Sequence, residues 1–378
     1  MDHDQSIAYE ETAHMKTTEQ TNHPRFEVAS MSKVGLHIQR LKEYLEGKAI
    51  FPITLELDLT SECTRACPEC PSSMAMHHHS LSMEFVERLF GYLEGRTAGL
   101  ILTGGEPTMA PLFPRALHMA RQRGFEEIAV VTNGSLLDQP HIAEALLAYV
   151  TTIRLSMYDW DEGPQEEGGL TLRKIETLRN LIERADSKLQ IGISFLTSTN
   201  RAMLLGKMAE AVWSAGAHWI YFHPLCTKWG LGCPELSDQE GVLAVISEMQ
   251  YRASFKNQVF MLRERYEHAP LEFDGYHAAH FLLVIGADGK NYLAPEVKYQ
   301  ASGVIADLGN GWNDTFLQER HRLARIRSIT SRAYPPLKSR HRGILYNHFI
   351  EHLNRKEKSA SGAFGGGPTT DFLFPHIL

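Results

Sequence analysis

Short apolar runs alternate with amphipathic stretches along most of the chain. The apolar runs are rich in β-branched residues and predict six strands, at residues 53–59, 99–103, 128–132, 152–157, 189–196 and 219–223. The amphipathic stretches predict helices at residues 82–95, 113–124, 141–149, 170–185 and 201–217. This alternation is typical of βαβ units, whose right-handed crossovers produce an open parallel barrel or sheet. The sequence therefore predicts an α/β fold with ligands at the carboxyl ends of its strands.

The pattern changes at three points along the chain. Residues 1–33 lack periodicity and are too polar to bury much apolar area, so they are predicted to be a mobile leader. The barrel is expected over residues 34–235, where a helix at 37–47 precedes the first strand. Residues 236–358 predict a smaller α+β appendage, with a helix at 235–254 and a hairpin that turns at residues 287–290. The Gly-rich segment 359–378 is expected to be a flexible tail with an apolar end.

Composition and charge narrow the class of function. A chain of 378 residues with 43% hydrophobic content supports a substantial buried core. The net charge of -7 provides no positive field for nucleic acid or an anionic membrane, which favours a small or peptidic substrate. Neither a membrane-spanning apolar stretch nor a secretion signal is evident. We therefore expect a cytoplasmic protein, in which clustered cysteines indicate metal ligands or redox groups.

Three of the five cysteines lie close together, directly after the first predicted strand. Cys63, Cys67 and Cys70 have the spacing CxxxCxxC, in the loop where a barrel of this kind has its active site. Thiolates are soft ligands for zinc or iron–sulfur clusters, and a purely structural site usually has four protein ligands. Three cysteines leave one metal position open, as a reactive centre requires. A zinc site completed by a histidine from residues 77–79 is the alternative.

The cysteine spacing and a second motif together resemble the radical S-adenosylmethionine (radical SAM) superfamily. The second motif is Gly104-Gly105-Glu106-Pro107, at the end of the second predicted strand, and the resemblance covers residues 50–225. It implies a partial (βα)6 TIM-like barrel, in which the three cysteines hold one [4Fe–4S] cluster and SAM binds the fourth iron. The glycines, which lack Cβ atoms, would let the backbone approach SAM, and Glu106 would accept from its ammonium group. By itself, the GGEP motif is equally compatible with a tight turn.

Three further positions correspond to SAM-binding segments of that superfamily. Asn133 follows the third predicted strand and Ser156 lies in the fourth, so the resemblance implies contacts with the ribose or carboxylate of SAM. A helix N-cap for Asn133 and a hydrogen-bonded strand serine for Ser156 are the alternatives. Glu69 stands where the superfamily usually has an aromatic residue, so only a backbone contact near the adenine is expected from it.

The resemblance also implies the reaction. An electron from a donor such as flavodoxin or ferredoxin would cleave SAM reductively, and the resulting 5′-deoxyadenosyl radical would abstract hydrogen from the substrate. Residues 282–310 resemble the SPASM or twitch region that carries an auxiliary cluster, but no cysteine follows Cys233. A degenerate region without a second cluster is therefore expected, which favours epimerisation or another redox-neutral outcome over oxidation. A small polar natural product or sugar-like molecule is the expected substrate.

Two residues at the end of the sixth predicted strand are candidates for further chemistry. Cys226 is expected in the barrel mouth, where its thiol would donate a hydrogen atom to a substrate radical, and His223 beside it would act as an acid. Packing as a small buried thiol and a place in the core are the alternatives for the two side chains.

Three other functions stay open after this reading of the sequence. The chain is also compatible with a radical SAM enzyme that modifies a peptide or protein, and with a dehydrogenase of a sugar or aminocyclitol. A non-enzymatic zinc-binding module is the remaining possibility, and it would not need the Gly104-Gly105-Glu106-Pro107 motif.

Overall fold

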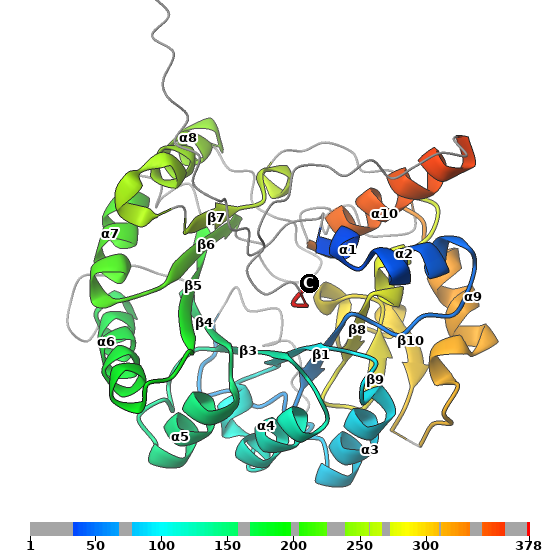
Figure 1. Cartoon of the computed structure of the whole chain (residues 1–378), viewed down its shortest axis with the longest axis horizontal. Coiled ribbons are helices and arrows are strands. Elements are labelled where there is room, and N and C mark those ends of the chain that lie inside the picture. Colours follow the sequence, from blue (N-terminus) through cyan, green and yellow to red (C-terminus); the bar gives the residue numbers. More distant parts are fainter. Residues whose placement is uncertain are drawn as a thin grey trace, which may run out of the picture.

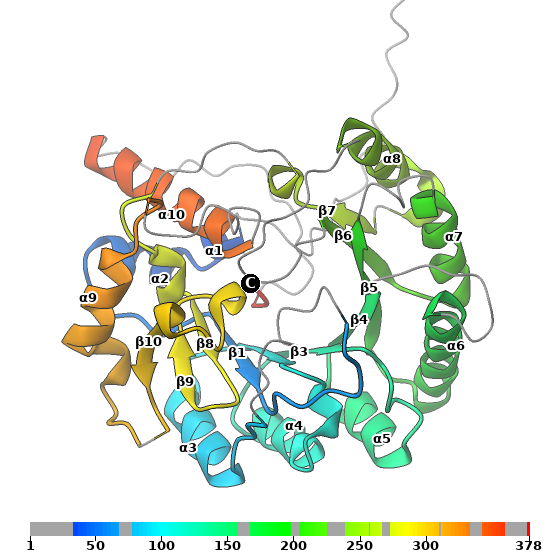
Figure 2. The ribbon, with the colours of Figure 1, turned by 180° about the vertical axis from the view of Figure 1, so that it is seen from behind.

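A single curved sheet organises the chain. The computed structural model describes residues 33–67, 78–157, 167–197, 204–224, 239–256, 258–266, 273–309, 311–332, 342–359 and 376–378. In these residues, ten strands form one sheet in the order β10-β9-β8-β1-β2-β3-β4-β5-β6-β7. The sheet curls into an open ring with helices on its outside, as seen from both sides (Figures 1 and 2). The predicted α/β fold, a partial TIM-like barrel, is confirmed.

The observed strands agree closely with the predicted runs. The six strands predicted from the sequence are β1 (Thr54–Asp58), β2 (Gly99–Thr103), β3 (Glu127–Thr132), β4 (Thr152–Met157), β5 (Gln190–Thr197) and β6 (Trp219–Pro224). They pair in parallel, each with the next. The predicted hairpin is also present, as antiparallel strands β8 (Leu282–Ile285) and β9 (Lys290–Tyr292).

Two strands and one pairing go beyond the sequence prediction. β7 (Val259–Met261) extends the parallel array beyond β6, and β10 (Val304–Asp307) pairs with β9. Both are too short for their alternation to be recognised in the sequence. In addition, β8 pairs in parallel with β1, so the hairpin continues the barrel sheet. The wall beside β1 therefore comes from residues more than two hundred positions away in the chain.

Helices cover the outer face of the sheet. Those between the predicted strands are α3 (Met83–Leu93), α4 (Phe113–Gln122), α5 (Pro140–Tyr149), α6 (Glu167–Ala185) and α7 (Leu205–Ala215). The remaining α-helices of the described residues are α1 (Lys33–Leu36), α2 (Ile38–Leu45), α8 (Gln239–Tyr251), α9 (Arg320–Ser328) and α10 (Arg342–Ser359). Among these helices, none has both the length and the apolar character that a membrane crossing requires.

The two faces of the strands differ in polarity. Leu55 and Leu57 of β1 belong to the large apolar core that includes residues of the outer helices. Successive side chains of a strand point to opposite faces, so Glu56 and Asp58 point toward the inside of the ring. Both carboxylates are nevertheless buried. The inner face of β1 is therefore charged, and this charge has to be compensated by other groups inside the barrel.

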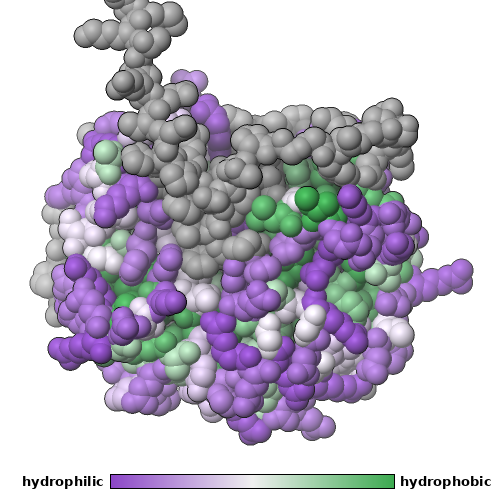
Figure 3. Space-filling model, in the orientation of Figure 1, coloured by the Kyte–Doolittle hydropathy of each residue, from purple (hydrophilic) through white to green (hydrophobic). Residues whose placement is uncertain are grey.

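The outer surface is mostly polar. Seen from the side of Figure 1, the described surface is mainly hydrophilic, with apolar areas of limited extent (Figure 3). The exposed large apolar side chains include Leu36 and Ile38, whose exposed fractions are 44% and 50%. Both flank the short link between α1 and α2.

The C-terminal residues 376–378 lie at the floor of the barrel, beside the amino ends of β1 to β3 (Figure 1). The Thr54 hydroxyl donates to the carbonyl of His376 at 2.6 Å and accepts from the N–H of Leu378 at 3.1 Å. The backbone N–H of His376 donates to the carboxylate of Glu127 at 2.8 Å, and Lys33 Nζ donates to the carbonyl of Ile377 at 3.0 Å. The apolar end of the chain is therefore packed into the body. The flexible part of the predicted tail falls on residues 360–375, which lie outside the described residues.

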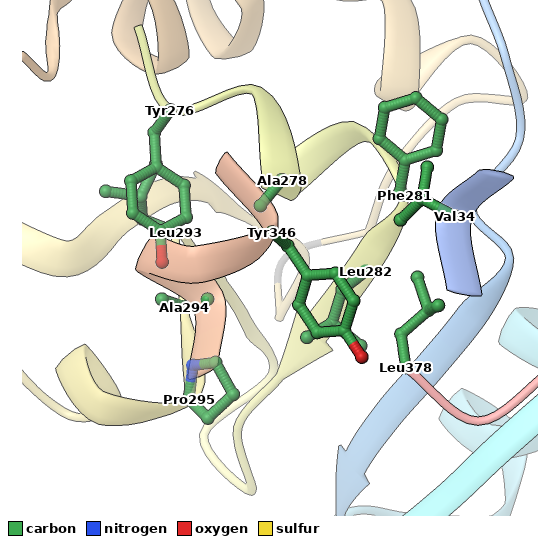
Figure 4. Close-up of a pocket in the computed structure, with 11 residues that line it drawn as sticks. Val34, Tyr276, Ala278, Phe281, Leu282, Leu293, Ala294, Pro295, Tyr346 and Leu378 are labelled. Atoms are coloured by element: carbon green, nitrogen blue, oxygen red, sulfur yellow. The ribbon is translucent and has the colours of Figure 1, made fainter. Parts of the chain in front are cut away.

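A narrow apolar pocket adjoins this floor. It lies between α1, α10 and the start of β8, and Leu378 points into it (Figure 4). The polar side-chain groups in its lining are the hydroxyls of Tyr276 and Tyr346. Because Leu282 at the amino end of β8 lines it, the pocket lies at the end of the barrel opposite the cysteine loop. We assign it to packing.

Alanine at Gly99 is expected to destabilise the protein by about 1–3 kcal/mol, since added atoms in a packed site force backbone shifts. A Cβ atom at Gly99 would lie 1.8 Å from the carbonyl oxygen of His376, so residues 376–378 would have to move. Gly206 in α7 is the matched control, because a Cβ atom there meets nothing within 4 Å. Urea denaturation should show a loss for Gly99→Ala and no loss for Gly206→Ala. Equal stability of the two variants would contradict the observed packing of the floor.

The docking of residues 376–378 is expected to weaken as the pH rises. Burial raises the pKa of Glu127 from 4.5 to about 7, against the opposing effects of the His376 N–H and Lys33. A carboxyl with a raised pKa in the folded state stabilises it at low pH, and this contribution is lost as the pH rises from 4.5 to about 7. Glu127→Gln mimics the protonated form at every pH. Its Tm should therefore rise relative to wild type between about pH 5 and 8. A difference in Tm between Glu127→Gln and wild type that does not change with pH would contradict this assignment. The nearby His376 and Glu126 are the same in both proteins.

Candidate functional site

The cysteine loop follows β1 at the carboxyl end of the strand. Cys63 is exposed and Cys67 is half-buried. The loop is fixed to the turn after β2 by two backbone bonds. The N–H of Gly105 donates to the carbonyl of Thr60 at 3.0 Å, and the N–H of Glu106 donates to the carbonyl of Glu62 at 2.7 Å. Among the predicted site residues, Cys70, Glu69 and Cys226 lie outside the described residues.

Two glycines let the turn after β2 lie directly against the cysteine loop. A Cβ atom at Gly105 would lie 2.0 Å from the carbonyl oxygen of Glu62, and one at Gly104 would lie 2.5 Å from that of Thr60. Gly104 also has φ of +122°, a conformation that side chains rarely adopt. The protein's own loop thus already requires glycine at both positions. Their expected approach to SAM stays a prediction.

Glu106 is fully buried and connects the ends of β2 and β3. Its side chain caps the 3-10 turn Pro107–Met109 by accepting from the N–H of Thr108 at 3.1 Å and from the Thr108 hydroxyl at 2.5 Å. It also accepts from the Thr132 hydroxyl at 2.7 Å and from the N–H of Asn133 at 2.8 Å. Oε1 takes three of these four bonds and Oε2 takes one. The predicted contact with the SAM ammonium would therefore have to be made at Oε2.

Asn133 is directed at the cysteine loop. Its amide Nδ2 donates to Cys63 Sγ at 3.5 Å and to the Thr64 hydroxyl at 3.0 Å. Its Oδ1 accepts from the N–H of Ser135 at 2.8 Å, which closes an Asx turn. The helix N-cap considered as the alternative is wrong, because α5 begins at Pro140 with Gln139 as its cap. The structure therefore brings Asn133 together with Cys63.

Polar side chains of β4 to β6 and of the turn after β7 form a second wall. It consists of Ser156, Ser194, Tyr221, His223 and Arg265, and we call it the β5–β6 wall. Ser156 pairs in register with Ser194, and Ser194 with Tyr221. The Ser194 hydroxyl is hydrogen-bonded to His223 Nε2 at 2.8 Å, and the Tyr221 and His223 rings stack at 5.4 Å. Arg265, from the 3-10 turn Arg263–Arg265, donates to the Tyr221 hydroxyl at 2.9 Å. The wall extends along strands that lie away from β1 in the ring (Figure 1).

Sequence reasoning identified Ser156 and His223 and missed their neighbours. Alternation along the sixth strand, read back from His223, would have indicated Tyr221 on the same face. Register along the parallel strands would have indicated Ser194. No local signal marks Arg265, because it lies in a short turn whose position depends on the packing of β7.

Comparison with known proteins identifies the class. Residues 57–213 match the sequence profile of the Radical SAM superfamily. SuiB of Streptococcus suis, bound to S-adenosylmethionine, has a similar structure with a TM-score of 0.60 at 14% identity, covering 79% of this chain and 72% of that one. Native anSMEcpe with bound AdoMet gives a TM-score of 0.53 at 18% identity, covering 73% of this chain and 83% of that one. No curated protein sequence matches the chain.

The chain thus contains a radical SAM domain. The protein is a radical SAM enzyme, and its cofactors are S-adenosylmethionine and a [4Fe–4S] cluster. The described residues fit the cluster. Cys63 and Cys67 would provide soft sulfur ligands on an anchored loop, and the amide of Asn133 donates to the Cys63 sulfur. Hydrogen bonds to the sulfurs are one of the factors that set the potential of such a cluster. The degenerate SPASM-like character of the region around β8 and β9 stays a prediction.

Proposed function

We propose that Cys63, Cys67 and Cys70 hold the cluster and that the enzyme abstracts a hydrogen atom from a small polar substrate, of natural-product or sugar-like type. We further propose a redox-neutral outcome such as epimerisation. The observation that carries the substrate class is the β5–β6 wall. Hydroxyl, imidazole and guanidinium groups there offer directional hydrogen bonds of the kind that orient hydroxylated or amino-substituted molecules.

In this proposal, the cofactors and the protein have separate roles. SAM and the cluster, when bound, supply the radical that removes hydrogen from the substrate. The β5–β6 wall orients the substrate, with His223 held in place by Ser194 and by the ring of Tyr221. Backbone and side-chain contacts of Gly104, Gly105 and Pro107, together with Asn133 and Ser156, would bind SAM. Cys226 would return a hydrogen atom to the substrate radical, and one electron from the proposed donor with a solvent proton would convert the resulting thiyl radical back to the thiol.

The proposal also includes an electron donor and a cellular place. A flavodoxin or ferredoxin is the proposed partner, because the reaction consumes one electron at a time. The cytoplasm is the proposed location, since its reducing conditions keep the thiols of the cysteine loop available for the cluster.

A peptide substrate is the second candidate. SuiB has also been solved bound to the precursor peptide SuiA, with a TM-score of 0.60 to this chain at 13% identity. Native anSMEcpe has been solved with the Cp18Cys peptide, with a TM-score of 0.53 at 17% identity. These structures are similar to this chain in fold, and they motivate peptides as a second group of compounds to test.

The deciding experiment is turnover in deuterated water. The reconstituted, reduced enzyme is incubated with SAM and separate panels of aminocyclitols, sugars and short peptides, and products are measured by mass spectrometry. We expect 5′-deoxyadenosine together with a small-molecule product that carries one solvent deuterium. Cys226→Ala should abolish the deuterium incorporation, whereas the matched variant Cys233→Ala should retain it. A product lacking two hydrogens and containing no deuterium would identify a dehydrogenase, and turnover of peptides alone would favour the second candidate.

A further inference from the structure

Two buried carboxylates on the inner face of β1 share one lysine. Lys298 Nζ lies 2.7 Å from Asp58 Oδ1 and 3.1 Å from Glu56 Oε1. All three side chains are buried, and Asp58 is completely inaccessible. Lys298 follows the 3-10 turn Pro295–Val297, just after β9. The C-terminal part of the chain therefore places a cation inside the barrel, against β1.

Tyr299 binds the other oxygen of Asp58. Its hydroxyl donates to Asp58 Oδ2 at 2.7 Å and accepts from the N–H of Ala287 at 3.1 Å. Tyr299 has φ of +63°, in the left-handed region that non-glycine residues seldom occupy. Lys298 and Tyr299 are consecutive in the chain, and both side chains reach the same carboxylate. Both oxygens of Asp58 are thus occupied by donors from these two residues.

Lys298 provides the positive charge for both carboxylates. When all three groups are ionised, two carboxylates contact one ammonium. Burial raises the pKa of Asp58, and the charge of Lys298 opposes that effect. Burial alone would lower the pKa of Lys298, but Asp58 and Glu56 outweigh it and raise the pKa above its usual value. Lys298 therefore remains charged, and its removal would take away the ammonium group that both Asp58 and Glu56 bind.

Asp58 lies at the base of both parts of the candidate site. It is the last residue of β1, and the loop that begins after it carries Cys63. On its other side it contacts the turn after β2, since a Cβ atom at Gly104 would lie 3.0 Å from Asp58 Cβ. Between these contacts, the carbonyl of Thr60 accepts from the N–H of Gly105. A shift of Asp58 would therefore move the cysteine loop and the Gly104–Glu106 turn together.

We propose that Lys298 and Tyr299 are positioning residues that fix the cysteine loop and the Gly104–Glu106 turn through Asp58, and so set SAM affinity and the electronic properties of the cluster. The proposal rests on the proposed role of Cys63 and Cys67 as cluster ligands. It makes the segment after β9 part of the reaction centre, where Lys298 and Tyr299 act through hydrogen bonds and charge.

The test uses the full chain, reconstituted anaerobically, with Lys298→Met, Lys298→Arg and Tyr299→Phe. Lys298→Met is expected to lower SAM affinity at least about tenfold, because small displacements of a site have large effects on binding and reactivity. The loss of one positive charge should also lower the reduction potential of the cluster and alter the electron paramagnetic resonance signal that SAM induces. Lys298→Arg should restore affinity to within about threefold of wild type, and Tyr299→Phe should lose about threefold, as the loss of one hydrogen bond implies.

Lys290→Met is the matched control, because Lys290 lies in β9, shortly before Lys298, and pairs with Asp288 at 3.2 Å but is 38% exposed. It should leave affinity, potential and spectrum unchanged. Wild-type values for Lys298→Met would overturn the proposal. If Lys298→Met fails to fold, wild-type SAM affinity and spectrum in Tyr299→Phe would overturn it instead. Failure of the cluster assignment is recognised separately, as retention of the cluster in Cys63→Ala.

Discussion

The Cys63→Ala variant is expected to lose the [4Fe–4S] cluster and to form 5′-deoxyadenosine from SAM at less than about a hundredth of the wild-type rate. Changes to residues that only support metal ligands already cost about 10–100-fold, so loss of a ligand should cost more. Cys67→Ala should behave in the same way, because both sulfurs lie on the loop anchored by Gly105 and Glu106. The measurements are iron and sulfide content, the visible spectrum, and 5′-deoxyadenosine after chemical reduction.

The control for this experiment is Cys233→Ala. It removes one of the two cysteines outside the CxxxCxxC motif and should leave about four irons per chain and normal SAM cleavage. Full iron content and normal cleavage in both Cys63→Ala and Cys67→Ala would show that the cluster is held elsewhere. Zinc in place of iron in the wild-type protein would contradict the cofactor.

The second large effect is expected at Glu106. Glu106→Ala removes a buried carboxylate that accepts four hydrogen bonds, from Thr108, Thr132 and Asn133. The donors left without an acceptor should reduce the free energy of unfolding by about 3 kcal/mol or more. Because Asn133 contacts Cys63, the cysteine loop should lose order as well. Urea denaturation of the reconstituted protein measures the first effect, and cluster loss during gel filtration measures the second.

Glu106→Gln separates this structural role from the predicted contact with SAM. The glutamine can accept through its one oxygen. Its amide nitrogen would face either the N–H of Asn133 or the donors of Thr108 and Thr132, and the unpaired donors would reduce the free energy of unfolding by about 1–3 kcal/mol. Under conditions in which this variant is folded, unchanged SAM affinity would limit Glu106 to its structural role. A raised Kd for SAM would support the ammonium contact. Glu62→Gln is the neighbouring control, since Glu62 is exposed and its pairing with His78 at 3.5 Å should contribute less than about 1 kcal/mol.

Local patterns in the sequence predict the first half of this fold well. β1 to β6 and the intervening helices follow from the periodicity of apolar residues, because each residue's face of the strand or helix is set by its position. This signal is contained in neighbouring positions of the sequence. The cysteine loop and the turn after β2 are also predicted, because both lie where strands with clear patterns end. The role of the two glycines is only half predicted. Their need for close backbone approach is evident from residue type, but the partner that approaches is the cysteine loop itself.

The parts that could not be predicted depend on contacts between distant segments. Lys298 lies 240 positions from Asp58, and nothing in its neighbourhood distinguishes it from a surface lysine. Arg265 reaches Tyr221 from a turn with no periodic pattern. Glu106 has the sequence context of a ligand-binding residue, yet its side chain is buried by donors from the next βα unit. In each case the partner is selected by tertiary packing, which overrides the local signal.

The floor of the barrel has a consequence for how the protein folds. Residues 376–378 contact Lys33 and Thr54 across 344 and 322 positions of the chain. Contacts of such separation form late, because the entropy of closing the intervening loop must be lost before they stabilise anything. During synthesis, the amino ends of β1 and β2 therefore lack these contacts until residue 378 has left the ribosome. Until then, the base of the nascent barrel is not covered by residues 376–378.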